Sequence, residues 1–294
     1  MSEQDGLVII DKPTDWTSHD VVARVRRLAG TRKVGHAGTL DPMATGVLVL
    51  GVNRATKLLG HLTLSTKTYK ATIRLGQAMS TDDAQGELLS EADASEVTDA
   101  QIAAGVAALS GEISQVPSSV SAIKVDGKRA YALVRGGAEV TLAARPATVS
   151  RFEVHATRRV GALIDVDVTV EVSSGTYVRA LARDLGAGLE VGAHLTGLRR
   201  TVVGPYSLAH AQTLEQAAEG LRLIPLAAAV TSSFPRRELS ELEASDIGYG
   251  RAIDASEIPG IVGVFYEDRC LALVQDGDVR GERMAKPQTV FHPS

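Results

Sequence analysis

The 294-residue sequence has a single cysteine, Cys270, so a disulfide within the chain is excluded. The same scarcity excludes a four-cysteine zinc site, and the seven histidines show no HExxH or other zinc-ligand spacing. No apolar run approaches the roughly 20 residues that cross a bilayer. The polar N-terminus lacks the basic and apolar regions of a signal peptide. We therefore expect a soluble, cytoplasmic protein without zinc, long enough to bury a core of its own.

A basic excess over the whole chain is also missing, because the net charge is −4. Taken alone, this sum argues against a polyanionic partner. The charges are unevenly distributed, however: residues 1–60 and 121–210 carry +2 and +4, whereas residues 61–120 and 211–294 carry −5 each. Local basic patches can bind RNA whatever the total charge. Charge therefore leaves two interpretations open, an RNA-binding face or ordinary solvated surfaces.

Hydrophobic periodicity predicts the secondary structure. Apolar residues alternate along residues 67–76, which predicts a half-buried strand. A helical apolar stripe follows Thr17 and Asp20, which have the spacing of a capping box. The polar, acidic residues 80–96 are typical of a loop. Further strands are expected at residues 7–13, 45–52, 148–160 and 162–172, and further helices at 98–111 and 175–189.

Strand and helix patterns are interleaved irregularly over residues 1–230, with hairpin-sized turns between several strands. This order predicts an α+β fold, with a mixed, largely antiparallel sheet and flanking helices, over a regularly alternating doubly wound fold. The stretch TSSFPRREL, residues 231–239, is typical of a linker. Short apolar runs between glycine, proline and acids over residues 240–294 then predict a small β module, close to the lower size limit for independent folding.

The stretch GHAGTLDPMATGVLVLGV, residues 35–52, joins a glycine-rich turn to an apolar strand. Its single acid, Asp41, is either a turn residue that bonds nearby backbone amides or a carboxylate presented for chemistry. A carboxylate beside a buried strand lies where the dielectric is low, so an unpaired charge there is costly and requires a cationic partner. The phosphate-loop pattern GxxxxGK[ST] is absent.

Two arginines of GTYVRALARDL, residues 175–185, are candidate partners for Asp41. Arg179 and Arg183 are four residues apart and therefore share a helical face. We interpret Arg183 as a surface residue paired with nearby Asp184 or Glu190. Arg179, near the expected start of the helix, is the candidate that remains.

Tyr69, Tyr177 and His36 each allow two interpretations. The tyrosines either pack within a sheet or helix, which is the commoner case, or stack on a nucleobase. His36 is either a solvent-exposed turn histidine or a side chain that fills the space left by a base flipped out of a nucleic-acid loop. None of these residues decides a function alone.

Six segments together nevertheless resemble one family in content and order. They are DKPTDWTSHDVVARVRRL, KVGHAGTLDPMATGVLVLGVNRATKLL, KTYKATIRLGQAMSTDDAQGE, GEISQVPSSVSAIKVDGKRAYALVRGG, SSGTYVRALARDLG and GAHLTGLRRTVVGPY. The chain resembles the TruB family of bacterial tRNA pseudouridine-55 synthases over residues 6–230. The C-terminal segment resembles a PUA-type RNA-binding module more loosely. The resemblance implies a pseudouridine synthase catalytic domain over residues 1–230 and a small β-barrel-like RNA-binding module over residues 236–294.

The resemblance also implies roles for the residues that match the family motifs. Asp41, in LDP, is the expected nucleophile. Arg179, in GTYxR, is expected to hold Asp41 ionised through a charge-assisted hydrogen bond. Tyr69, in KTY, is expected to stack on the uracil and to serve in proton removal from its C5 atom. Tyr177 and Leu198 match positions that contact the flipped uridine.

Two further residues and one segment match parts of the family that meet RNA. His36 matches the histidine that occupies the vacated space in the T-loop. Lys12, in DKP, is expected to support the fold of the site and to contact RNA. Residues 117–145 match a segment that closes over the T-loop. Its candidate phosphate contacts are Lys124, Lys128, Arg129 and Arg135.

We therefore expect an isomerase that converts uridine 55 of the tRNA T-loop into pseudouridine by base flipping, as a monomer, without cofactor or membrane partner. One alternative is a tRNA-binding or tRNA-folding chaperone that uses the same cleft without catalysis. Another is a glycoside hydrolase with an aspartate nucleophile, which would need a second positioned carboxylate as its acid. The sequence offers no convincing candidate for that second carboxylate.

Overall fold

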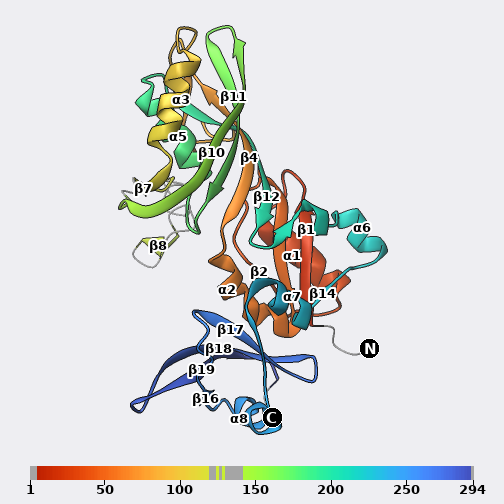
Figure 1. Ribbon diagram of the computed structural model, residues 1–294. Coiled ribbons are helices and arrows are strands. Elements are labelled where there is room, and N and C mark those ends of the chain that lie inside the picture. The colour runs from red at the N-terminus through yellow and green to blue at the C-terminus, as the bar shows by residue number, and fades with distance from the viewer. Residues whose placement is uncertain (1–4, 119–123, 126–127, 130–141, 293–294) are drawn as a thin grey trace. The chain divides into compact units, whose positions relative to one another are not determined.

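A computed structural model describes residues 5–118, 124–125, 128–129 and 142–292 (Figure 1). The chain forms two compact units. Unit 1 consists of residues 1–42, 46–63 and 204–294, and unit 2 of residues 43–45 and 64–203. Within the described ranges, no helix is long and apolar enough to cross a membrane.

Strand β3 is the centre of the N-terminal part of unit 1, because it pairs along both edges. β1 lies antiparallel on one edge, with Lys12 opposite Gly46, and β2 lies antiparallel on the other, with His36 opposite Leu50. All residues of β3 after Thr45 are buried, which explains the continuous apolar run in the sequence. The elements here are β1 (Gly6–Lys12), α1 (Ser18–Leu28), β2 (Val34–His36), β3 (Thr45–Val52), η1 (Asn53–Leu58), α2 (Leu59–Thr63), β13 (Tyr206–Ser207), η2 (Leu208–His210), α6 (Leu214–Glu219), β14 (Ile224–Pro225) and α7 (Leu226–Ser233).

The C-terminal part of unit 1 is a small β module with its own sheet and core. Its strands follow the order β15-β17-β18-β19-β16, and β15 is parallel to β17 while the other pairs are antiparallel. Val262, Val264 and Ile247 belong to its buried cluster. The elements are β15 (Arg236–Glu238), α8 (Glu241–Gly248), β16 (Ile253–Asp254), β17 (Ile261–Tyr266), β18 (Arg269–Val279) and β19 (Glu282–Val290).

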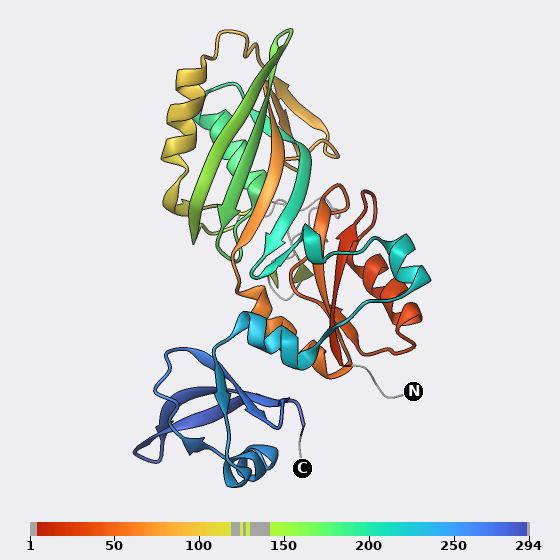
Figure 2. The same cartoon turned by 45° about the vertical axis from the view of Figure 1, so that its right-hand side comes forward.

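Strand β4 is the central strand of unit 2, and it lies antiparallel to β11 on one side and β12 on the other. The order continues as β12-β4-β11-β10-β7. Buried and partly exposed residues alternate along β4, so one face is apolar, and the helices α3 and α5 pack on the sheet there (Figures 1 and 2). The elements are β4 (Lys67–Leu75), β5 (Gln77–Met79), β6 (Leu88–Glu91), α3 (Asp99–Ala108), β7 (Gly111–Gln115), β8 (Lys124–Val125), β9 (Lys128–Arg129), β10 (Arg145–Val160), β11 (Leu163–Val172), α5 (Val178–Gly188) and β12 (Ala193–Val203).

The structure confirms the predicted α+β class and most of the predicted elements. The capping box at Thr17 and Asp20 is present, and the hairpin expected around Gly161 is formed by β10 and β11. Two expectations are wrong. The supposed linker at residues 231–239 contains the end of α7 and the strand β15, and the supposed loop at residues 80–96 contains β6. β15 owes its conformation to pairing with β17, about 27 residues further along the chain, and β6 owes its conformation to pairing with the nearby β5. Local composition reports neither pairing.

Gly186 allows α5, the helix that carries Arg179, to lie close to the chain entering β12. A Cβ atom at Gly186 would collide with the backbone of Gly192 and Ala193, whereas a Cβ at Gly188 would meet nothing within 4 Å. We expect Gly186→Ala to lower the free energy of unfolding by about 1–3 kcal/mol. Gly188→Ala is the matched control and should leave that free energy unchanged or raise it by about 0.5–1 kcal/mol. Urea denaturation measures both, and equal values would contradict this account of the close approach.

Candidate active site

The backbone on both sides of Asp41 is held in place within unit 1. The Ser18 hydroxyl donates to the Leu40 carbonyl oxygen at 3.1 Å and accepts from the Leu40 amide at 2.9 Å. On the other side, the Asp15 amide donates to the Pro42 carbonyl oxygen at 2.9 Å. Asp41 itself is partly exposed. The loop therefore presents a carboxylate from a backbone that has little freedom to move.

Lys12, the last residue of β1, adds a second constraint on the same loop. Its side chain is 0% exposed, and its ammonium donates to the carbonyl oxygens of Pro13 at 2.9 Å, Trp16 at 2.6 Å and Pro42 at 3.1 Å. An ammonium has three N–H donors, so it can donate to all three carbonyl oxygens at once. The geometry supports the expected role in the fold of the site. It does not support a direct contact of Lys12 with RNA, because the ammonium is enclosed.

His36 is the last residue of β2 and lies opposite Leu50 of β3. Its side chain is partly buried, and its ring meets the ring of His19 edge-on, with 5.7 Å between the centroids. The interpretation of His36 as a solvent-exposed turn histidine is therefore wrong. The strand pairing and the ring contact place the His36 imidazole beside His19 of α1.

Tyr69 and Leu198 lie on one face of unit 2. Tyr69 of β4 is directly opposite Arg200 of β12, and Leu198 is opposite Ala71, two residues along each strand. Residues opposite each other in an antiparallel pair share a face, as do residues two apart. Tyr69 and Leu198 are thus diagonal neighbours, and this is the apolar face on which α5 packs.

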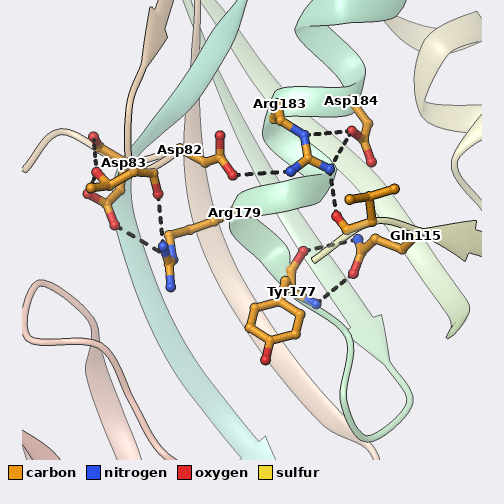
Figure 3. Close-up of polar contacts among 9 residues, drawn as sticks. Asp82, Asp83, Gln115, Tyr177, Arg179, Arg183 and Asp184 are labelled. Carbon is orange, nitrogen blue, oxygen red and sulfur yellow. Dashed lines mark hydrogen bonds and ion pairs between the residues drawn. The ribbon is translucent and has the colours of Figure 1, made fainter. Parts of the chain in front are cut away.

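Arg179 of α5 is buried, with 4% of its surface exposed, and it interacts with the turn at residues 80–86 (Figure 3). Its Nη1 donates to the Thr81 carbonyl oxygen at 2.8 Å, and its Nε lies 3.6 Å from Oδ2 of Asp83. Asp83 is itself oriented by the Thr81 hydroxyl at 2.6 Å and the Gln85 amide at 3.1 Å. The Asp83 carboxylate therefore receives two donors on one oxygen and faces the Arg179 guanidinium with the other.

Arg183, one turn further along α5, joins three segments. It bonds to Asp184 at 2.9 Å, to Asp82 at 3.3 Å and to the Val116 carbonyl oxygen at 2.7 Å. The expected pair with Asp184 is present, but the interpretation of Arg183 as only a surface residue is wrong. Burial raises the pKa of the Asp82 carboxyl, and the Ser118 hydroxyl and the two arginines oppose this shift.

Tyr177 is the N-cap residue of α5, and Gln115, the last residue of β7, holds its backbone. The Gln115 amide nitrogen donates to the Tyr177 carbonyl oxygen at 3.1 Å, and its oxygen accepts from the Tyr177 amide at 2.9 Å (Figure 3). Gln115 is buried. One side chain thus satisfies both polar backbone groups of the residue that begins the helix, two positions before Arg179.

The structure therefore brings the predicted residues together in two sets. The first set belongs to unit 1: Asp41 lies in the loop after β2, His36 ends β2, and Lys12 bonds to the loop at Pro42. The second set, Tyr69, Tyr177, Arg179 and Leu198, belongs to unit 2. The predicted pairing of Asp41 with Arg179 joins residues of different units and stays a prediction.

Sequence reasoning missed Asp83, Asp82 and Gln115. Residues 80–96 were interpreted only as a polar loop. The available signal was the adjacent pair of acids before Gly86, which could supply the anion that a buried Arg179 requires.

Two other predictions concern metals and the basic segment at residues 117–145. In the part of the chain that the structure describes, no group of three or more His, Cys, Asp or Glu side chains is arranged to hold a metal ion. Of the predicted phosphate contacts, Arg135 lies outside the described residues. For Lys124, Lys128 and Arg129 the structure describes the backbone alone, as the short strands β8 and β9.

Three family models match successive parts of the chain. Residues 26–178 match the TruB family pseudouridylate synthase N-terminal domain. Residues 179–224 match the tRNA pseudouridylate synthase B C-terminal domain, and residues 234–292 match the tRNA pseudouridine synthase II C-terminal domain. Together they cover both the main part of the chain and the small module.

Named relatives and solved structures agree with these matches. The tRNA pseudouridine synthase B of Arthrobacter sp. (strain FB24) is 60% identical, over 98% of this chain and 97% of its own. That of Paenarthrobacter aurescens (strain TC1) is 64% identical, over 98% and 95%. The fold is similar to a chain in the crystal structure of the archaeal box H/ACA sRNP Nop10–Cbf5 complex, with a TM-score of 0.72, 25% identity, and coverage of 99% of this chain and 87% of that one.

Replacing Asp83 or Asp82 by asparagine tests whether the Asp83–Arg179 pair contributes more to stability than the adjacent Asp82–Arg183 pair. We expect Asp83→Asn to lower the free energy of unfolding by about 3 kcal/mol or more, because it removes a buried carboxylate that lies 3.6 Å from a buried guanidinium. Asp82→Asn should cost about 1 kcal/mol or less, because Arg183 is partly exposed and keeps Asp184. Urea denaturation at pH 7 gives both values, and equal losses would show that Asp83 is not specifically required by Arg179.

Lys67, the first residue of β4, should make the stability of the fold depend on pH. Burial, assisted by the nearby Arg200 guanidinium, lowers the pKa of the Lys67 ammonium from 10.5 to about 8. Between these two pH values the unfolded chain binds more protons than the folded chain, so stability should rise with pH across this window. We expect the wild type to gain stability relative to Lys67→Met between pH 7.5 and 10, as measured by urea denaturation. A difference that stays constant with pH would contradict the lowered pKa.

Proposed function

Because the chain belongs to the TruB family of pseudouridylate synthases, we propose that Asp41 is the nucleophile with which it converts uridine 55 in the tRNA T-loop into pseudouridine. The chain is a tRNA pseudouridine synthase, an isomerase, as its near-full-length relatives at 60–64% identity are. The observation that carries the residue assignment is the Asp41 loop, whose backbone is fixed by Ser18, Asp15 and Lys12. Such a loop can present a carboxylate without cost for ordering it at the moment of reaction.

The reaction breaks the bond between ribose C1′ and uracil N1 and forms a bond between C1′ and uracil C5. N1 gains a proton and C5 loses one, so that no atom is gained or lost overall. A carboxylate can attack the sugar or remove its C2′ proton, and it can leave again, which suits it to a reaction that ends with the enzyme unchanged. The base must first leave the stack of the T-loop, at a cost of a few kcal/mol.

The residues of unit 2 are proposed to hold the flipped uridine. Tyr69 stacks on the uracil and accepts the C5 proton, while Tyr177 and Leu198 contact the nucleoside. Arg179 keeps Asp41 ionised, and Asp83 and Thr81 orient Arg179. His36 fills the vacated space in the T-loop, supported by the edge contact with His19.

Residues 1–230 form the proposed catalytic domain, and residues 236–294 the proposed RNA-binding module of PUA type. The partner is the T-stem-loop of tRNA, bound by a monomer in the cytoplasm, where tRNA is found. The five-stranded sheet with its own core supports the assignment of the second part as a module. The family match at residues 234–292 supports it as well.

Asp41→Asn should abolish product formation, with a loss on the order of 10⁴-fold or more in single-turnover rate, because the amide is a poor nucleophile and base. Mass-based mapping of pseudouridine in tRNA incubated with wild type and variant measures this. Equal amounts of pseudouridine from both proteins would contradict the assignment of Asp41 as the nucleophile. The same assay separates two alternatives: a hydrolase would release free uracil, whereas a chaperone without catalysis would give no product with the wild type either.

Arg179→Ala should lower the single-turnover rate by about 10²–10³-fold, since it removes the cation proposed to stabilise the Asp41 carboxylate. The dissociation constant for tRNA should change much less, because Arg179 is buried and directed at protein groups. A preserved rate would show that Asp41 does not depend on Arg179.

A further inference from the structure

Four basic residues of unit 1 gather outside the residues proposed for catalysis, and we call them the cationic cluster: Arg54, Lys57, Arg269 and His292. Arg54 and Lys57 lie on the 3₁₀ helix η1 that follows β3. Arg269 begins β18, and His292 lies just beyond β19. The cluster thus joins the N-terminal part of unit 1 to the β module, through residues far apart in sequence.

Two guanidinium groups share a single imidazole nitrogen in this cluster. Nη1 of Arg54 lies 2.6 Å from Nδ1 of His292, and Nη2 of Arg269 lies 3.4 Å from the same atom. Guanidinium nitrogens only donate, so Nδ1 accepts and the imidazole is neutral. Burial and the charges of Arg54 and Arg269 lower the pKa of His292, with a further contribution from Lys57 and opposition from Asp5. His292 therefore holds two cations close together without adding a negative charge.

The described residues around the cluster supply little compensating charge. Asp5 accepts from the Arg54 backbone amide at 2.8 Å and lies 3.7 Å from its guanidinium. Asp268, beside Arg269 in sequence, is directed to Arg236 at 3.2 Å. Lys57 is anchored by the Val290 carbonyl oxygen at 2.7 Å, which is neutral. Three permanent cations thus face one carboxylate.

The arginines are also accessible to a ligand. The side chain of Arg54 is 45% exposed, and Arg269 is exposed. Each guanidinium has five N–H donors in a fork that matches phosphate oxygens. Cations held this close repel one another, so an anion that bridges them removes an unfavourable interaction as well as forming a favourable one.

We propose that the cationic cluster binds a backbone phosphate of the RNA substrate through Arg54 and Arg269, with Lys57 adding to the local positive potential. A phosphodiester has two non-bridging oxygens, one for each guanidinium. Such a contact positions RNA without reading its sequence. The inference rests on the proposed function, since it takes tRNA as the ligand. It also explains how a protein of net charge −4 can hold a polyanion outside the nucleobase site.

The test measures the dissociation constant of tRNA as a function of NaCl concentration for wild type, Arg54→Gln and Arg269→Gln. Each variant should reduce the slope of log K against log salt by about 0.7–0.9, which is the value for one lost phosphate contact. At 0.1 M salt that slope corresponds to a loss in affinity on the order of tenfold, which vanishes towards 1 M. The single-turnover rate at saturating tRNA should equal that of the wild type, because none of these side chains takes part in the reaction.

Arg283→Gln is the matched control, because Arg283 is an exposed arginine of the same β module, with 71% of its side chain accessible. We expect wild-type affinity and slope for this variant. An unchanged slope in both Arg54→Gln and Arg269→Gln would overturn the proposal, as would a loss of affinity that persists at 1 M salt together with a lower melting temperature. That second pattern would mark the cluster as a structural contact. Product formation by the wild type in the same assay separates failure of this proposal from failure of the proposed function.

Discussion

A buried ammonium, that of Lys12, is the constraint on which the candidate nucleophile depends. It sits at the end of β1, fully enclosed, and joins the turn at residues 13–16 to the carbonyl oxygen of Pro42. A buried cation is tolerated only when its donors are satisfied, so the three carbonyl groups and the ammonium determine one another's positions. Ser18 holds Leu40 on the other side, so the backbone on both sides of Asp41 has a defined position.

On helix α5, too, buried or half-buried cations are held by polar partners from another segment. Arg179 and Arg183, one helical turn apart, meet the consecutive acids Asp83 and Asp82 of a single turn. The deeper pair is enclosed, while the outer pair is partly exposed and shared with Asp184. A buried pair of this kind is costly to break from one side. The arrangement therefore orients Arg179, as its proposed role beside Asp41 requires.

In each set of site residues, a buried side chain also holds the backbone of another residue in place. Gln115 satisfies the amide and carbonyl of Tyr177, and Ser18 does the same for Leu40. In both cases a buried side chain pairs with backbone that regular secondary structure leaves open. Asp41 follows Leu40 directly, and Tyr177 is itself the residue that Gln115 holds. We propose that both act on the substrate.

The sequence by itself determined the α+β class, the central strands β3 and β4, and the capped helices, because periodicity and capping are local signals. It also isolated Asp41 as a carboxylate in need of a cation, and its motifs indicated the family. Tertiary structure alone decided that Asp83 faces Arg179, that Gln115 holds Tyr177, and that His36 lies in a strand beside His19. These contacts join residues about 17 to 96 positions apart along the chain. Neither composition nor period reports which distant backbone or charge will lie opposite a given side chain, and that is settled only when the sheets pair and the helices pack.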